Sequence, residues 1–251
     1  MPDNTTSPAY VTASAAILEQ VLLGNFMDVL KVEKQRTLKP YPTLARNICR
    51  EGVVRGTLSG LWPWGVGMYG VRGGVFGMGY STARDYFPEK HRHVGASVVG
   101  GLLEGALTSP LSMMRTRAIQ KQAGESTPLP SLAQVLRPAP LNSAKRAIDW
   151  GIRSALYTVL PGSSCASAFI AGGASAILTT PIDRLLPVIQ QHGAPHRIRE
   201  WWTEELRAKG LRHIMAGTTA RVLHSAWHTM FVFGALDLSQ EYFSSARRSE
   251  Q

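Results

Sequence analysis

The sequence predicts an all-α membrane protein with six transmembrane helices, and three observations lead to this prediction. From Ser154 to Ile182 the chain has no charged residue over 29 positions, and about twenty apolar residues suffice to cross a bilayer. Low-charge segments rich in glycine and alanine recur six times. Three connections hold nineteen of the twenty-seven lysines and arginines. Six spans with their basic loops on one side account for all three observations.

The low-charge segments set the expected positions of the spans. They lie at about 10–27, 56–83, 94–114, 143–160, 162–183 and 214–236. We expect helices over about 7–35, 65–87, 94–122, 143–160 and 214–243, with the fifth beginning after a turn at Pro161 and Gly162. Small residues let such helices pack closely in lipid around a polar interior. A soluble all-α protein with long buried helices is the competing interpretation, although the uncharged run is hard to fit into a globular core.

One unusual unit occurs three times along the chain. In its clearest copy an apolar helix meets Pro181 and then Asp183. A second copy spans Thr108–Arg115, and a weaker third copy spans Asn25–Lys31. Because a repeated unit indicates a repeat architecture, we expect three pseudo-symmetric two-helix repeats. Their predicted bounds are residues 1–90, 91–161 and 162–251, and the second repeat is shortened.

Two connections have the pattern of helices that lie on a membrane surface. Leu44–Val54 places apolar residues at helical spacing among basic ones, and Arg197–Gly210 contains the pair Trp201 and Trp202. Aromatic residues of this kind anchor helices at the membrane interface. Glu19 is expected on the interior face of the first span, because an ionisable residue in a membrane helix faces the bundle interior.

The net charge of +10 is compatible with two partners. The tails and the turns at 84–93 and 161–164 carry only five of the basic residues, which predicts both termini on the side opposite the basic loops. Nucleic-acid binding is one interpretation of a basic chain. Because the charges lie between the helices, we expect lipid headgroups as the partner and no nucleic acid.

The sequence gives little support for a cofactor or a cleavable leader. Cys49 and Cys165 are the only cysteines, so neither a disulfide framework nor a cysteine metal site is expected, and no cofactor is predicted. No nucleophile–base arrangement or phosphate loop is present, so an enzyme is not expected. The start of the chain has neither an apolar leader nor an arginine-rich presequence, so any targeting signal is expected to be internal.

These features resemble the mitochondrial carrier family over nearly the whole chain. That family repeats three times a helix ending in Pro-x-[Asp/Glu]-x-x-[Lys/Arg], a matrix-side surface helix and a second span. Pro181–Asp183 matches the motif, Pro110–Arg115 matches apart from its acid, and Asp28–Lys31 matches apart from its proline. Further similarity lies in Glu51-Gly52, Gly60-Leu61-Trp62, Lys209-Gly210 and Gly217–His224. The resemblance implies a multi-pass protein of the inner mitochondrial membrane, with both termini on the intermembrane-space side and cardiolipin expected at its basic loops.

The resemblance also implies a gate on the matrix side of the bundle. In the family each motif acid pairs with the base of a following repeat, and the ring of pairs closes the cavity toward the matrix. By this rule Asp28 pairs with Arg115, and Asp183 pairs with Lys31. Gln35 and Gln190 stand where the family often has a glutamine beneath these pairs.

The third pair of that ring is lost in this chain. Ser112 and Leu186 occupy its positions, so the acid and the base are missing together. The joint loss is physically consistent, because removing one partner of a buried ion pair costs about 3–5 kcal/mol. We therefore expect two surviving pairs, with Ser112 facing Leu186.

The second gate of the family, on the cytoplasmic side, is expected to have no ion pairs. Its motif is [Phe/Tyr]-[Asp/Glu]-x-x-[Lys/Arg], and the base is missing from all three copies. The degenerate positions are Asp85 with Pro88, Thr158 with Pro161, and Asp237 with Gln240.

Carrier substrates are contacted midway along the even helices, and the resemblance places four candidates there: Arg72, Lys145, Arg146 and His224. Arg72 and Arg146 have the chemistry to hold an anionic carboxylate or phosphate. Alternatively, they pair with Glu19, Glu104 or Asp149 inside a sealed bundle. For His224 a hydrogen-bonded interior histidine is the favoured interpretation over a ligand or a switch.

Two functional hypotheses follow. In the first, the chain keeps the carrier fold but serves as a structural subunit of a larger inner-membrane complex, such as one of the respiratory chain. In the second, it transports a small anionic metabolite by alternating access. The degenerate gates favour the first hypothesis slightly, because a transporter needs two states of comparable free energy.

Overall fold

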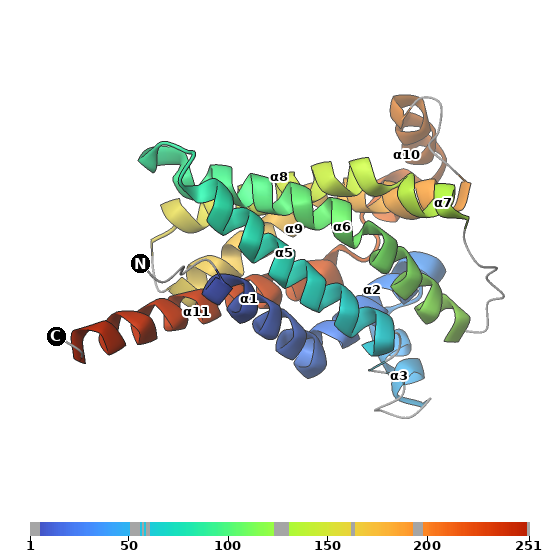
Figure 1. The fold of residues 1–251 in the computed structure, drawn as a ribbon. Helices are drawn as coiled ribbons and strands as arrows, with labels where there is room; N and C mark the ends of the chain where they lie inside the picture. The colour runs from blue at the N-terminus through green and yellow to red at the C-terminus, as the bar shows by residue number, and fades with distance from the viewer. Residues whose placement is uncertain are drawn as a thin grey trace.

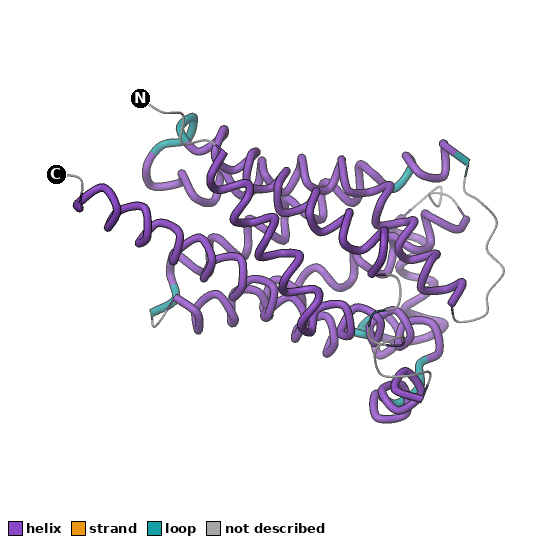
Figure 2. The backbone as a smooth tube through the Cα atoms, turned by 60° about the horizontal axis from the view of Figure 1, so that its bottom comes forward, coloured by secondary structure: helices purple, strands orange, loops and turns teal. Residues whose placement is uncertain are grey.

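The computed structural model describes residues 6–50, 56, 58, 61–122, 131–161, 164–192 and 198–249. Nearly all of these residues are helical, and Figure 2 shows no strand among them. The predicted signature residues Glu51, Gly52 and Gly60 lie outside the described residues. The side chains of Gln190, Asp237 and Gln240 also lie outside them.

Six long helices form the body of the protein. The first is continuous through α1 (Thr6–Glu19), the π-helical turn η1 (Gln20–Gly24) and α2 (Asn25–Thr37). The second, α5 (Val66–Arg84), follows the π-helical turn η2 (Leu61–Gly65). The others are α6 (Arg92–Gln122), which follows the short 3₁₀ helix η3 (Glu89–His91), α8 (Ala139–Val159), α9 (Ser164–His192) and α11 (Thr218–Ser249). The shortest has 19 residues, which corresponds to about 28 Å of helix and so nearly spans the bilayer core.

Three shorter helices connect the long ones at a single end of the bundle. These are α3 (Tyr41–Arg50), α7 (Leu132–Leu136) and α10 (Ile198–Ile214). Figure 1 shows all three at one end, which we call the connection end, while α1 begins and α11 finishes at the opposite, terminal end. The tight connection from α5 to α6 also lies at the terminal end. This is the arrangement that the asymmetry of basic loops predicts.

The six long helices form a closed ring in chain order. Each packs against the next, from α1 through α5, α6, α8 and α9 to α11, and α11 packs against α1 and α2. Each of the three predicted repeats therefore contributes two adjacent helices. An all-α ring of paired helices is the predicted fold, and the structure confirms it.

The bundle is polar inside and apolar outside, as a membrane protein requires. Leu22, Leu107 and Leu178 are about 60% exposed on the outer surface, whereas Glu19 and Glu104 are fully buried. Within the part of the chain that the structure describes, three helices are long and apolar enough to cross a membrane, namely Ala9–Gln35, Glu89–Arg115 and Cys165–Leu186. The fourth long helix, α8, contributes the most buried charges to the interior, namely Lys145, Asp149 and Arg153.

Glycines permit the close approach of neighbouring helices. A Cβ atom on Gly101 would lie 2.6 Å from the carbonyl oxygen of Arg146, and one on Gly105 would lie 2.5 Å from the Cα of Ser143. The α6–α8 contact is therefore a backbone contact that any larger residue would force apart.

Several predicted boundaries differ from the structure. The fourth span begins at Ala139 rather than near residue 143, because prolines at the start of a helix have no amide hydrogen to leave unsatisfied. The sixth span begins at Thr218 rather than near residue 214. Gly217 has φ of +88°, which interrupts the helix before it. The second span ends at Arg84, three residues earlier than expected.

Candidate functional site

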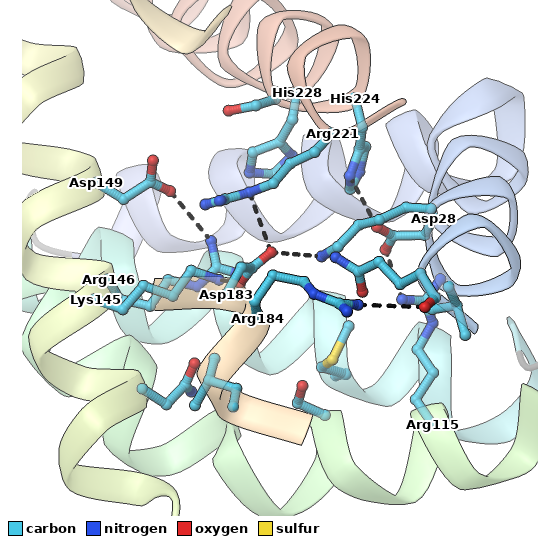
Figure 3. Close-up of a pocket in the computed structure, with 18 of the residues that line it drawn as sticks. Asp28, Arg115, Lys145, Arg146, Asp149, Asp183, Arg184, Arg221, His224 and His228 are labelled. Carbon is cyan, nitrogen blue, oxygen red and sulfur yellow. Dashed lines mark hydrogen bonds and ion pairs between the residues drawn. The ribbon is translucent and has the colours of Figure 1, made fainter. Parts of the chain in front are cut away.

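A central cavity of about 530 Å³ runs from the middle of the bundle toward the connection end. Its wall carries nine lysines and arginines but only four acids, Asp28, Asp149, Asp183 and Glu205. Figure 3 shows these charged side chains reaching inward from several helices. A protein interior normally avoids uncompensated charge, so this excess of basic over acidic residues is unusual.

Asp28 on α2 and Arg115 on α6 form the first predicted ion pair. The Nη1 atom of Arg115 donates to Oδ2 of Asp28 over 2.6 Å. The hydroxyl of Tyr69 also donates to this oxygen, and Asn25 accepts from Nη2 of Arg115 over 2.7 Å. All four side chains are buried. The pair is thus embedded in a hydrogen-bond network, which a buried ion pair needs in order to offset its desolvation.

Asp183 on α9 holds the second predicted pair and two further bases (Figure 3). Lys31 Nζ lies 2.8 Å from its Oδ2, and Arg221 Nε lies 3.1 Å from the same oxygen. Lys145 of α8 contacts Oδ1. Three cations therefore converge on one carboxylate. Asp183 can neutralise one of them, which leaves a surplus of two positive charges. The resemblance to the carrier family predicted only Lys31 as the partner of Asp183.

The third position of the ring carries no ion pair. Ser112 and Leu186 both line the cavity where that pair would stand. Gln35 lines it as well, and Arg184 donates to the Gln35 carbonyl oxygen over 3.3 Å. The cavity therefore extends past the level of the two surviving pairs on this side.

Arg72 and Arg146, two of the substrate-contact candidates, share the carboxylate of Glu104. Their Nε atoms lie 2.9 Å and 3.2 Å from Oε1 of Glu104. The indole Nε1 of Trp150 donates to Oε2 over 2.5 Å. Arg72 and Arg146 also line the cavity. Pairing with an interior acid and contact with an anionic ligand are thus compatible for these arginines, since each has a carboxylate partner and also borders the cavity.

The other two candidates also have acidic partners. Lys145 binds Asp183, as described above, and the Nδ1 atom of His224 lies 3.0 Å from Oδ1 of Asp28. His224 is an interior histidine with hydrogen-bond partners, as expected. Deeper in α8, Asp149 accepts from Arg153 over 2.6 Å. The charges of the fourth span therefore face the interior, which is the condition under which a membrane helix tolerates them.

Aromatic side chains from α5, α8 and α11 pack together on the side of the cavity that faces the terminal end, and we call this group the aromatic closure. The rings of Phe76 on α5 and Trp150 on α8 stack with centroids 3.9 Å apart. Phe233 of α11 packs against Trp150 and against Tyr157, with centroids 6.2 Å and 4.6 Å apart. Trp150 is 1% exposed. Asp85 and Pro88, at the degenerate gate positions, are exposed.

Sequence reasoning missed the place of Arg221 in this site. Arg221 sits one turn before His224 in the same helix, and its place in a low-charge segment was the available signal. The expected pairing of Arg72 and Arg146 with Glu104 is confirmed. The aromatic closure could not be foreseen, because it depends on how three separate helices face one another.

Comparison with known proteins agrees with the geometry. The family model for "Mitochondrial carrier protein" matches residues 157–247, which contain α9, α10 and nearly all of α11. No curated protein matches the chain. The matched segment contains the Pro181–Asp183 motif, and the ring of six helices has the architecture that this family implies. Over residues 157–247 the chain is similar to the mitochondrial carrier family.

Proposed function

We propose that this protein is a multi-pass carrier of the inner mitochondrial membrane that binds a small anion in its central cavity and transports it. The observation that carries the proposal is the convergence of Lys31, Lys145 and Arg221 on Asp183. Uncompensated charge in a low-dielectric interior costs several kcal/mol per ion. A carboxylate or phosphate group beside these bases would offset that cost and accept hydrogen bonds from them.

The size and position of the cavity support the same function. A volume of about 530 Å³ falls within the range of small-molecule sites, about 300–1,000 Å³. The cavity borders both surviving ion pairs and also the aromatic closure, through Trp150's neighbours Asp149 and Arg153. A ligand in it would thus contact elements that alternating access has to rearrange.

The direction and lipid contacts of the carrier follow from its charge distribution. We expect the terminal end to face the intermembrane space and the connection end to face the matrix, because the basic residues concentrate at the connection end. Anionic lipid, with cardiolipin as the expected species, would bind at those basic connections.

A specific observation also favours the second candidate, a structural subunit of a larger inner-membrane complex. Arg72 and Arg146 already have Glu104 as partner, and Arg153 has Asp149. Part of the polar interior is therefore satisfied without a ligand. The surplus around Asp183 is the feature that this candidate does not explain, so we place transport first.

The experiment is a ligand screen by thermal unfolding of the purified protein in detergent. Phosphate, malate, citrate, glutamate and ADP are added separately, and a ligand at 100 times its Kd stabilises by about 2.7 kcal/mol. We expect at least one anion to raise the Tm. Lys145→Gln and Arg221→Gln should abolish the shift, while Lys90→Gln, on the exposed terminal end, should retain it. Absence of any anion-dependent shift would favour the structural subunit.

A further inference from the structure

A second cluster of titratable groups lies beside the anion cavity and is separate from the Asp183 surplus. It is formed by Glu19, at the end of α1, and by His224 and His228, one turn apart on α11. Glu19 is fully buried, and its Oε2 lies 3.2 Å from Nδ1 of His228. Its Oε1 lies 3.4 Å from Nε2 of His224. Both histidines line the cavity, so a proton can reach them from its water.

The local backbone is built to hold Glu19 in this place. The π-helical turn η1 begins at the next residue, and such turns occur frequently at functional sites. The side chains of Glu19 and Gln20 both fold over Gly24, where even a Cβ atom would collide with them. An ionisable residue buried within a membrane span is by default a candidate for a functional role.

The hydrogen bonds of His224 are those of a neutral imidazole ring, and a further acceptor, Oε1 of Glu19, lies close to it. Its Nδ1–H donates to Asp28 over 3.0 Å, and its Nε2 accepts from the Gln20 amide over 2.8 Å. That amide also donates to Oε2 of Glu19 over 2.6 Å. Oε1 of Glu19 accepts no hydrogen bond although it is buried. An unpartnered carboxylate oxygen thus faces the one ring nitrogen that can take up a proton.

We infer that His224 and Glu19 form a proton-binding site that couples proton movement to anion transport. A proton from the cavity binds Nε2 of His224, and the hydrogen bond from the Gln20 amide to that nitrogen is broken. The imidazolium then donates to Oε1 of Glu19 on one side and to Asp28 on the other. The step forms one N–H bond and adds one positive charge to the cavity wall, which favours an anion; the anion favours the proton in return.

The surroundings connect this proton to the gate at the connection end. Asp28 accepts from Arg115 and from Tyr69 as well as from His224. Arg115 and His224 contact different oxygens of this carboxylate, so a charged His224 shares the negative charge of Asp28 with Arg115. The ion pair that closes the ring and the proton site share one residue.

The charged and titratable groups around the two histidines come from the first helix, α5, α6 and α8. The first helix supplies Glu19 and Asp28, α5 supplies Tyr69, and α6 supplies Arg115 through Asp28. From α8, Arg153 is close enough to His228 to interact with it electrostatically, and the Trp150 ring lies 6.1 Å from the His228 ring. Of these, Glu19 contacts both histidines directly.

The proton site is tested first without any transport. Histidine-labelled protein in nanodiscs is followed by ¹⁵N NMR, and the His224 signal is assigned by its loss in His224→Gln. We expect Nε2 to change from acceptor to protonated form between about pH 5 and 8. Glu19→Gln should move the midpoint of this change, and His91→Gln, on the exposed terminal end, should not. A ring that stays neutral throughout, or a midpoint that Glu19→Gln leaves in place, overturns the site.

The coupling rests on the proposed function and has its own readout. Liposomes containing the protein are given labelled phosphate, malate, citrate, glutamate or ADP, with and without an inward proton gradient. We expect the gradient to increase the initial rate several-fold in the wild type and in His91→Gln, and the ratio to fall to one in His224→Gln. Uptake with a ratio of one in the wild type overturns the coupling alone. No uptake of any anion overturns the proposed transport and the coupling together, while the NMR result still decides the proton site.

Discussion

Arg72 on α5 and Arg146 on α8 approach the same oxygen of one buried carboxylate, with Nε atoms 2.9 Å and 3.2 Å from Oε1 of Glu104 on α6. Three consecutive helices of the ring are thus joined through one side chain that is fully buried. Arg72 depends on this carboxylate, and Arg146 shares it while also lying 3.7 Å from Asp149.

Glu104→Gln should therefore destabilise the protein strongly. The amide is nearly isosteric but leaves Arg72 without its carboxylate partner and Arg146 with Asp149 alone, 3.7 Å away, at a cost of about 3–5 kcal/mol. For a chain of this size we expect the Tm in detergent to fall by roughly 10 °C. Glu89→Gln is the matched control, because Glu89 is exposed and should shift Tm by less than about 2 °C. Equal shifts in the two variants would contradict the shared-carboxylate arrangement.

The stacked rings of Phe76 and Trp150 lead to a graded prediction. Trp150→Ala removes the ring that packs on Phe76 and should cost about 3–5 kcal/mol. Trp150→Phe keeps a ring but loses the hydrogen bond to Glu104, and should cost about 1.5–3 kcal/mol. Unfolding in detergent measures both. If Trp150→Phe were as damaging as Trp150→Ala, the stack would contribute little and the account of this closure would be wrong.

Two glycine positions on different helices should respond oppositely to alanine. In Gly101→Ala the new Cβ would lie 2.6 Å from the Arg146 carbonyl oxygen, so α6 and α8 must separate and the Tm should fall. In Gly74→Ala nothing lies within 4 Å of the new Cβ, and the better helix propensity should stabilise α5 by about 0.5–1 kcal/mol. Similar Tm values for both variants would rule out the close α6–α8 contact.

His213, on the α10 helix outside the membrane spans, should make stability depend on pH. Burial lowers its pKa, and the nearby Arg184 and Lys209 lower it further, against an opposing effect of Glu205. The unfolded chain then binds the proton more readily than the folded one. The free energy of unfolding should therefore rise as pH increases toward the ordinary histidine value of about 6.5 and level off above it.

The measurement compares Tm between about pH 5 and 7.5 in the wild type and in His213→Gln. Other groups contribute to both proteins, so the difference between the two curves isolates His213. We expect the wild type to lose more stability than the variant on acidification. Parallel curves would show that the ring is equally easy to protonate in the folded and unfolded protein.

The sequence predicted much of this molecule, for identifiable reasons. The long uncharged segments predicted the six long helices, because a helix must be about twenty residues long to cross a bilayer. The uneven distribution of lysine and arginine predicted which connections lie at the same end of the bundle. The acids of the repeated motif gave the pairs Asp28–Arg115 and Asp183–Lys31, which the structure brings within 2.6 Å and 2.8 Å. Their role as a gate stays a prediction.

What the sequence did not reveal depends on which side chains meet between distant helices. Lys145 and Arg221 join Asp183 from α8 and α11, and no spacing rule connects these three positions. The lack of a side chain at Gly24 is needed only because the side chains of Glu19 and Gln20 lie over it at the π-helical turn. The direction of the charged side chains of the fourth span, α8, toward the cavity is also visible only in the structure.

The central claim is that the surplus positive charge around Asp183 belongs to an anion transport site, and uptake by reconstituted protein tests it most directly. Liposomes loaded with unlabelled phosphate, malate, citrate, glutamate or ADP are offered the same labelled anion outside. We predict saturable uptake of at least one anion, lost in Arg221→Gln and retained in Lys90→Gln. If all five anions enter no faster than in protein-free liposomes, while the protein remains folded, the transport account is contradicted.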